Sequence, residues 1–158
     1  MRQQVRIADL PEDSTWPKHE IIDGTLIVTP YAGLPHQAAV GRLHLALAGA
    51  APDGVVVYPG ANVRRVADGG ESLLIPDVVV ARADTTDPTY LAPEDVLVAV
   101  EVVSPGSRTM DLVTKRATYA AWGIPAYLVL DLAAPAGEGL TWHGDTSAVA
   151  WAVAAVQG

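Results

Sequence analysis

Apolar runs broken by glycine and proline divide the chain into alternating β and α segments. Two short apolar stretches flank Asp23-Gly24, a pair that favours a tight turn, and they predict a hairpin near the start of the chain. Residues 36–50 repeat apolar side chains at helical spacing behind Pro35, a residue that helix starts tolerate. This pattern predicts the first helix.

A second helix is expected among the strands that follow. Residues 110–122 have a helical composition and stop at Gly123. Continuous apolar runs on either side predict strands, and a strand, helix, strand order implies a parallel pair at the centre of a buried sheet. These strands are expected within residues 54–66, 73–82, 96–104 and 126–131. Two stretches around Gly144-Asp145, LTWH and AVAWAVAAV, predict a last hairpin.

Two carboxylates interrupt the apolar strands of this pattern. Asp77 follows Pro76 within residues 73–82, and Glu101 lies within the run VLVAVEVVS. A buried charge is costly unless it is paired, protonated or bound to a metal. If the two strands are neighbours, the carboxylates converge and repel unless a cation lies between them, and magnesium favours such a site. The alternative is that Asp77 caps a turn and Glu101 pairs with a nearby lysine or arginine.

Composition narrows the class of protein. The 158 residues are enough for a sizeable core in one domain, expected over residues 1–158, and the 50% hydrophobic content excludes a disordered chain. No cysteine is present, so any metal must be held by carboxylate, imidazole or backbone oxygen. Residues 1–13 lack an apolar signal core, and no apolar run approaches the roughly 20 residues of a membrane span. A cytoplasmic protein without membrane contact is therefore expected.

The charge balance weighs against a general nucleic-acid binder. The chain carries a formal net charge of −8 and only 10 lysines and arginines in total. Since phosphate contacts need local positive charge, DNA binding requires a concentrated basic patch. Arg64 and Arg65 on one β segment, with Arg108 behind the strand of Glu101, are the candidates for substrate contacts.

Several stretches of the chain resemble a known family. They are HEIIDGTLIVTP, PHQAAVGRLHLAL, IPDVVV, VAVEVVSPGSR and DLVTKRATYAAWGIPAYLVLD, which together span residues 19–131. They are similar to the PD-(D/E)xK nuclease superfamily and, more closely, to the Uma-two family of restriction-endonuclease-like proteins. The resemblance implies an α/β fold with a restriction-endonuclease-like mixed central sheet, an αβββαβ core, an extra N-terminal hairpin and C-terminal strands.

The resemblance also implies a metal site. Asp77 and Glu101 match the metal-binding carboxylates, and the backbone carbonyl of Val102 is a further candidate ligand. Glu20 matches another acidic position that would complete the site, although an exposed place in the hairpin explains this residue as well. The cofactor implied is magnesium or manganese.

The signature lysine of the superfamily is expected two residues after Glu101, where Val103 stands. In the family it lies on the following helix, and Lys115 matches that position. Its role would be to position or deprotonate the attacking water and to offset charge on the phosphate. His36 matches a position that would contact substrate, or else it makes a hydrogen bond at the helix N-terminus.

The second helix leaves two alternatives open. Asp111 and Lys115 are four residues apart and would form a solvated surface pair, worth only a few tenths of a kcal/mol. Arg116 falls on the apolar side of a helical wheel, where it would be the partner of a buried carboxylate.

Two functions follow from these observations. The first is a magnesium-dependent endonuclease that hydrolyses DNA phosphodiester bonds, with Asp77, Glu101 and Lys115 as catalytic residues. The second is a catalytically inert, dimeric binding or regulatory module on the same fold, which the acidic balance favours. A homodimer is expected because the apolar C-terminal segment would leave a sheet edge open to another subunit.

Overall fold

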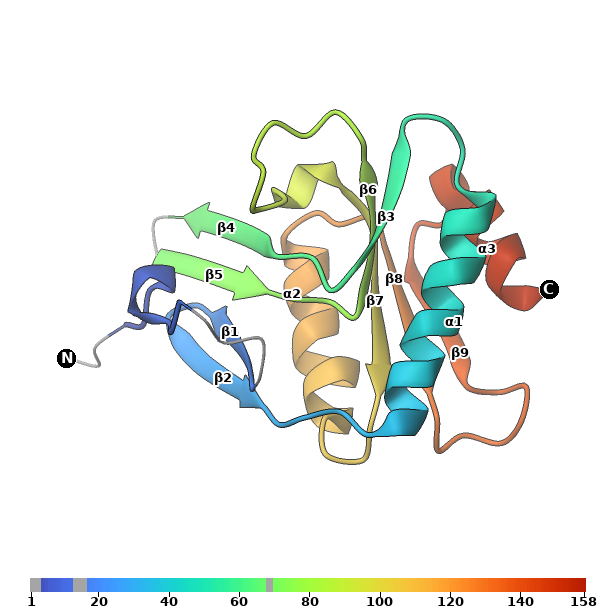
Figure 1. Cartoon of the computed structure of the whole chain (residues 1–158), viewed down its shortest axis with the longest axis horizontal. Coiled ribbons are helices and arrows are strands. Elements are labelled where there is room, and N and C mark those ends of the chain that lie inside the picture. Colours follow the sequence, from blue (N-terminus) through green and yellow to red (C-terminus); the bar gives the residue numbers. More distant parts are fainter. Residues whose placement is uncertain (1–3, 13–16, 68–69) are drawn as a thin grey trace.

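The computed structural model describes residues 4–12, 17–67 and 70–158. The chain forms two sheets, a four-stranded sheet of order β2-β1-β5-β4 and a five-stranded sheet of order β3-β6-β7-β8-β9 (Figure 1). The strands are β1 (Lys18–Ile22), β2 (Thr25–Thr29), β3 (Val55–Pro59), β4 (Val63–Ala67), β5 (Gly70–Leu74), β6 (Val78–Arg82), β7 (Val96–Val103), β8 (Ala126–Asp131) and β9 (Leu140–Gly144). The helices are α1 (Leu34–Ala50), a π-helix (Met110–Lys115) that continues as α2 (Arg116–Ala121), and α3 (Ala150–Gln157). Short 3-10 turns lie at Ile7–Asp9, Pro93–Asp95 and Ser147–Val149.

Strand β7 is the centre of the five-stranded sheet. It pairs antiparallel with β6 and parallel with β8, and α2 is part of the crossover that a parallel pair requires. Helices α1 and α3 cover one face of this sheet, and α2 lies on the other face, between the two sheets (Figure 1). For the five-stranded sheet the predicted order of helix, three strands, helix and strand is confirmed as α1, β3, β6, β7, α2 and β8, whereas β4 and β5, which lie between β3 and β6 in the chain, belong to the other sheet. Both faces of β7 are buried, which explains why every residue of the strand except Glu101 is apolar.

The apolar run at residues 73–82 does not form one strand. Leu74 ends β5 in the four-stranded sheet, and Val78 begins β6 in the five-stranded sheet. Pro76 stands between them, where its missing N–H interrupts ladder pairing. Because Val78 is paired with Val100, this crossing places Asp77 beside the part of β7 that carries Glu101.

The prediction of a C-terminal hairpin is wrong. Only LTWH and the glycine after it form a strand, β9, whereas the run AVAWAVAAV forms a 3-10 turn and α3, which packs on α1. Its small and large residues alternate as in a strand, but Val149, Ala152 and Val156 share one helical face against the core. Alanine-rich segments favour helix. Strand β9 forms this edge of the five-stranded sheet, so the C-terminal part contributes one strand to the edge that favoured a homodimer, and the run AVAWAVAAV contributes none.

None of the helices in the described part of the chain has the length and apolar character of a membrane span.

Candidate active site

A cavity of about 340 Å³ lies where the two sheets meet the first turn of α1 and the π-helix. Five of the residues singled out from the sequence line this cavity, namely His36, Asp77, Glu101, Val102 and Lys115. Lys18 and Asp111 line it as well. Residues far apart in the sequence therefore converge on one point.

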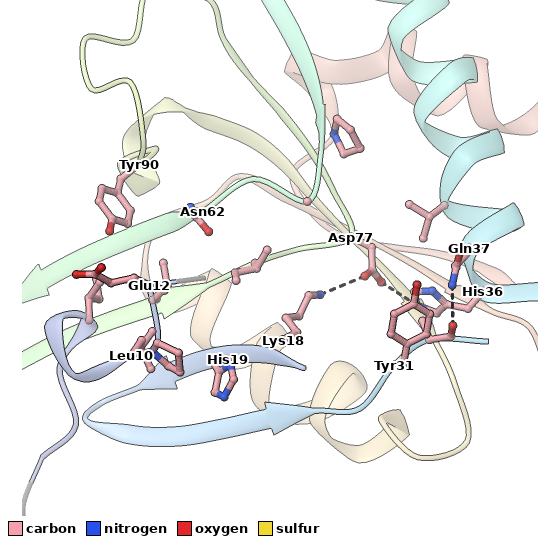
Figure 2. Close-up of a pocket in the computed structure, with 18 of the residues that line it drawn as sticks. Leu10, Glu12, Lys18, His19, Tyr31, His36, Gln37, Asn62, Asp77 and Tyr90 are labelled. Carbon is pink, nitrogen blue, oxygen red and sulfur yellow. Dashed lines mark hydrogen bonds and ion pairs between the residues drawn. The ribbon is translucent and has the colours of Figure 1, made fainter. Parts of the chain in front are cut away.

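Asp77 is held by three donors at the crossing between the sheets. Its Oδ2 accepts a hydrogen bond of 2.8 Å from the backbone N–H of Val102 and lies 3.2 Å from Nε2 of His36. Its Oδ1 accepts a hydrogen bond of 3.2 Å from Nζ of Lys18 (Figure 2). Burial alone would raise the pKa of Asp77, but the contact with His36 and the charge of Lys18 outweigh it and hold that pKa well below its usual range. Asp77 is therefore ionised.

The same contact favours the protonated form of His36. Its hydrogen bond with Asp77 raises the pKa of the imidazole above its usual value, against the opposing effect of burial. His36 belongs to the first turn of α1, as the sequence predicted, and its Nε2 faces a carboxylate. The imidazole thus orients Asp77 at the cavity wall.

Lys115 lies in a buried cluster with three carboxylates. Its Nζ donates a hydrogen bond of 2.8 Å to Oε1 of Glu101, and it lies 3.1 Å from Oε2 of Glu20 and 3.7 Å from Oδ1 of Asp111. Tyr119 also donates to Oε1 of Glu101, at 2.9 Å. The side chains of Lys115, Glu101 and Glu20 are 4%, 2% and 0% exposed, so water cannot screen their charges.

The charges of this cluster do not balance. Burial raises the pKa of Glu101 to about 8 despite the attraction of Lys115, and burial likewise raises the pKa of Asp111. Burial would lower the pKa of Lys115, but the surrounding carboxylates, Glu101 first, raise it above its usual value. One ammonium faces three acids, and the raised pKa of Glu101 means that the cluster retains a proton at neutral pH.

Glu20 is a buried residue and not an exposed part of the hairpin. Its Oε1 accepts a hydrogen bond of 2.7 Å from the backbone N–H of Ile75, in the crossing between the sheets. Its Oε2 is within ion-pair distance of Lys115 but makes no aligned hydrogen bond. Glu20 therefore fastens β1 to the crossing and leaves one buried oxygen without a hydrogen-bond donor.

Two alternatives for the second helix are wrong. Asp111 and Lys115 are each only 3% exposed, so they are not a solvated pair, and Arg116 is exposed and cannot be the partner of a buried carboxylate. A helical wheel places Asp111 and Lys115 on a polar side with Thr114 and Thr118, but in the structure Asp111 and Lys115 are buried, as are Tyr119 and Trp122. A helical wheel alone cannot distinguish a polar face that lines a cavity from one that meets solvent.

The three arginines expected to contact DNA do not form one strip. Arg64 and Arg65 are successive residues of β4, so their side chains lie on opposite faces of the sheet. Arg64 forms a hydrogen bond of 2.6 Å with Glu71, and Arg108 is paired with Asp131. Both of these guanidinium groups are therefore already engaged.

Lys18 is a site residue that sequence reasoning missed. It lies two residues before Glu20 in β1, and side chains two apart share a face of a strand. Once Glu20 is placed in the site, this spacing would have indicated Lys18 as well.

The donor chemistry at the cavity suits the magnesium or manganese ion expected from the sequence. Within the described residues, no three or more histidine, aspartate or glutamate side chains are placed to hold an ion together, because the carboxylate oxygens face Lys18 and Lys115. However, Asp77 and Glu101 line the same cavity, and magnesium usually takes one or two carboxylates with waters and phosphate oxygens. All the candidate ligands are hard oxygen donors, which fits these ions.

The fold and the convergence of acids on one cavity define a protein with a restriction-endonuclease-like fold. The family model described as "Uma2: Putative restriction endonuclease" matches residues 5–152, and the chain belongs to this family. The chain is also similar to the crystal structure of "a putative nuclease belonging to DUF820" from Anabaena variabilis, with a TM-score of 0.66 and 15% identity over 93% of this chain and 89% of that chain. A comparison with curated proteins found no match.

Proposed function

We propose that the protein is a magnesium- or manganese-dependent nuclease that hydrolyses phosphodiester bonds of DNA, with Asp77, Glu101 and Lys115 as its catalytic residues. The family and the fold support a nuclease. The observation that carries the proposal is that these three residues, from three separate segments, line one cavity together. A chain that kept the fold only for its surface would not need this convergence.

Asp77 and Glu101 are the proposed metal carboxylates, with the carbonyl of Val102 and the buried Oε2 of Glu20 as further candidate ligands. A divalent ion in this position would activate a water molecule and stabilise charge on the leaving oxygen. Asp77 is ready to bind such an ion, because Lys18 and His36 keep it ionised.

Lys115 is proposed to position the attacking water and to offset the negative charge that develops on the phosphate. Its carboxylate neighbours raise its pKa, so its side chain is an ammonium and cannot accept a proton from water. Of the two roles expected from the sequence, positioning is therefore favoured over deprotonation.

The alternative function is an inert binding or regulatory module. It is favoured by the ion pair of Asp77 with Lys18 and by the hydrogen bond from Lys115 to Glu101, since these lysines already provide partners for both carboxyl groups without help from a metal. In this alternative the acids and lysines stabilise the junction of the two sheets only. This alternative includes a homodimer, and sedimentation of the purified protein tests its oligomeric state.

The deciding experiment is a cleavage assay on labelled DNA with magnesium or manganese. The unmodified protein is expected to cut, and Asp77→Asn and Glu101→Gln to lose roughly a hundredfold or more of the rate. Asp53→Asn is the matched control, because Asp53 is exposed and does not line the cavity. If the folded, unmodified protein cuts no nucleic acid with either ion, the inert module replaces the nuclease.

A further inference from the structure

A groove of about 940 Å³ opens next to the candidate active site. Lys18, Tyr31, His36 and Asp77 line both this groove and the cavity that contains Glu101 and Lys115. In Figure 2, Asp77 lies at the inner end of the groove with Lys18 and His36, while Tyr90 and Asn62 lie farther along it. A molecule bound in the groove would therefore reach the proposed catalytic carboxylates.

The walls of the groove are mainly apolar and aromatic. Ile7 and Leu10 come from the N-terminal segment, and Leu73 and Val40 come from β5 and α1. Two tyrosines add ring surfaces: Tyr31 is 68% exposed, and the ring of Tyr90 has the guanidinium of Arg64 at 5.4 Å from its centroid. Such walls suit flat, uncharged groups and offer little to a row of phosphates.

Among the residues that line the groove, positive charge is concentrated at the inner end, whereas farther along it the guanidinium of Arg64 over Tyr90 is paired with Glu71. Among the described lining residues, the basic side chains are Lys18, His36 and His19, and Glu12 adds an acid. Lys18 and His36 both contact Asp77, so the positive charge lies where a single phosphate would meet the proposed metal site. The groove therefore suits a ligand that places one phosphate beside the carboxylates and lays uncharged groups along the rest of the groove.

A DNA duplex does not fit this distribution. It presents two dense rows of phosphates and keeps its bases stacked inside, so its binding depends on many lysine and arginine contacts. The arginines best placed in sequence for such contacts are engaged or lie on opposite faces, and the net charge is −8. An unpaired strand differs, because its bases are free to stack on aromatic rings.

We propose that this groove binds the unpaired bases of a single-stranded nucleic acid, stacked against Tyr31 and Tyr90, and places the adjoining phosphate beside Lys18 and Asp77. This assignment rests on the proposed nuclease function and gives it a substrate class. Stacking on tyrosine is tolerant of sequence, so the groove discriminates by strandedness more than by base identity.

The test is the binding of fluorescein-labelled eight-nucleotide strands, followed by anisotropy at low salt with calcium in place of a catalytic ion. The single strand is expected to bind roughly tenfold or more tighter than the same sequence in a duplex, because only unpaired bases reach the rings. Tyr31→Ala and Tyr90→Ala should each weaken binding of the single strand about 5- to 150-fold, which corresponds to about 1–3 kcal/mol per stacked base.

Matched variants separate stacking from folding. Tyr31→Phe and Tyr90→Phe keep the rings and should bind as the unmodified protein does, and so should Leu45→Ala, which removes an exposed apolar side chain outside the groove. Circular dichroism of each variant reports whether the fold is intact.

Three results would overturn the assignment. The first is that the duplex binds as tightly as the single strand or more tightly, and the second is that neither alanine variant, although folded, weakens binding. The third is that an unlabelled apolar peptide binds the groove more tightly than the single strand and displaces it. If the protein cleaves duplex DNA with metal and the tyrosines have no effect, the proposal for the groove is wrong but the proposed nuclease function is kept. Tyrosine-dependent binding of single strands without any cleavage would instead sink the nuclease.

Discussion

The ammonium of Lys115 lies 2.8 Å from Oε1 of Glu101, and both side chains are almost completely buried. A buried pair of this kind adds little net stability, since both groups lose their hydration. Removal of one partner strongly destabilises the fold, because the remaining charges are then left uncompensated away from water. Lys115 is therefore needed for the fold as well as for the proposed chemistry.

Lys115→Met is expected to lower the free energy of unfolding by about 3–5 kcal/mol, because Glu20, Glu101 and Asp111 would lose their shared cation. Arg116→Met is the control, because Arg116 is the exposed neighbour of Lys115. It should change the free energy of unfolding by no more than about 0.5 kcal/mol. Urea denaturation followed by circular dichroism measures both. Equal small losses would mean that the lysine is hydrated in solution.

Glu101→Gln is expected to flatten the dependence of stability on pH. The folded protein holds the proton of Glu101 up to about pH 8, whereas the unfolded chain releases it near 4.5. The folded state binds more protons in between, so stability falls as pH rises through this window, by at most about 1.4 kcal/mol per pH unit. Denaturation at several pH values should show this slope in the unmodified protein and a smaller one in the variant. Identical slopes would refute the raised pKa.

Manganese is expected to raise the melting temperature by about 5–10 °C at a hundredfold excess over Kd, through preferential binding to the folded state. Asp77→Asn and Glu101→Gln should abolish the increase, and Asp53→Asn should preserve it. Differential scanning fluorimetry checks this independently of any cleavage. A melting curve indifferent to millimolar manganese in all four proteins would speak against the metal site.

Gly144→Ala should destabilise the protein strongly, whereas Gly41→Ala should stabilise it. Gly144 has a φ of +83°, and an added Cβ would press into the carbonyl oxygen of Pro125 next to the paired strand β8. Left-handed backbone alone costs about 1–2 kcal/mol for other residues, before the clash is counted. Gly41 lies inside α1 with open space at its Cβ, where alanine is favoured by about 0.5–1 kcal/mol. Thermal melts of both variants compare the two effects, and equal shifts would contradict the structure at Gly144.

Much of the fold could be predicted because its signals are local. Asp77 and Glu101 interrupt apolar runs, and such interruptions indicate buried carboxylates without knowledge of the partners. The C-terminal run misled because alternation of small and large residues also occurs in this helical segment, where Val149, Ala152 and Val156 pack on the core at helical spacing and Trp151 is partly buried beside them.

The site could be predicted only in part, because its electrostatics depend on contacts between segments far apart in the chain. Lys115 was indicated by position, but its burial among acids from β1 and β7 depends on how the two sheets meet. The sequence indicates Lys18 only through its spacing from Glu20, and its contact with Asp77 depends on how the two sheets meet. The strand position of Arg64 and Arg65 was foreseeable, and period-two alternation alone already places them on opposite faces.

The crossing Ile75-Pro76-Asp77 is too short to gain or lose a residue without moving Asp77. Insertions and deletions in this chain must therefore fall elsewhere. The turn at Pro52-Asp53 between α1 and β3 is exposed and lines neither the cavity nor the groove, so inserted residues there would extend a surface loop and leave the site unchanged. One residue inserted between Ile75 and Asp77 would move the carboxylate by one strand position and turn it away from the N–H of Val102. Natural variation in length should therefore accumulate at the exposed turn between α1 and β3 and be absent from Ile75, Pro76 and Asp77.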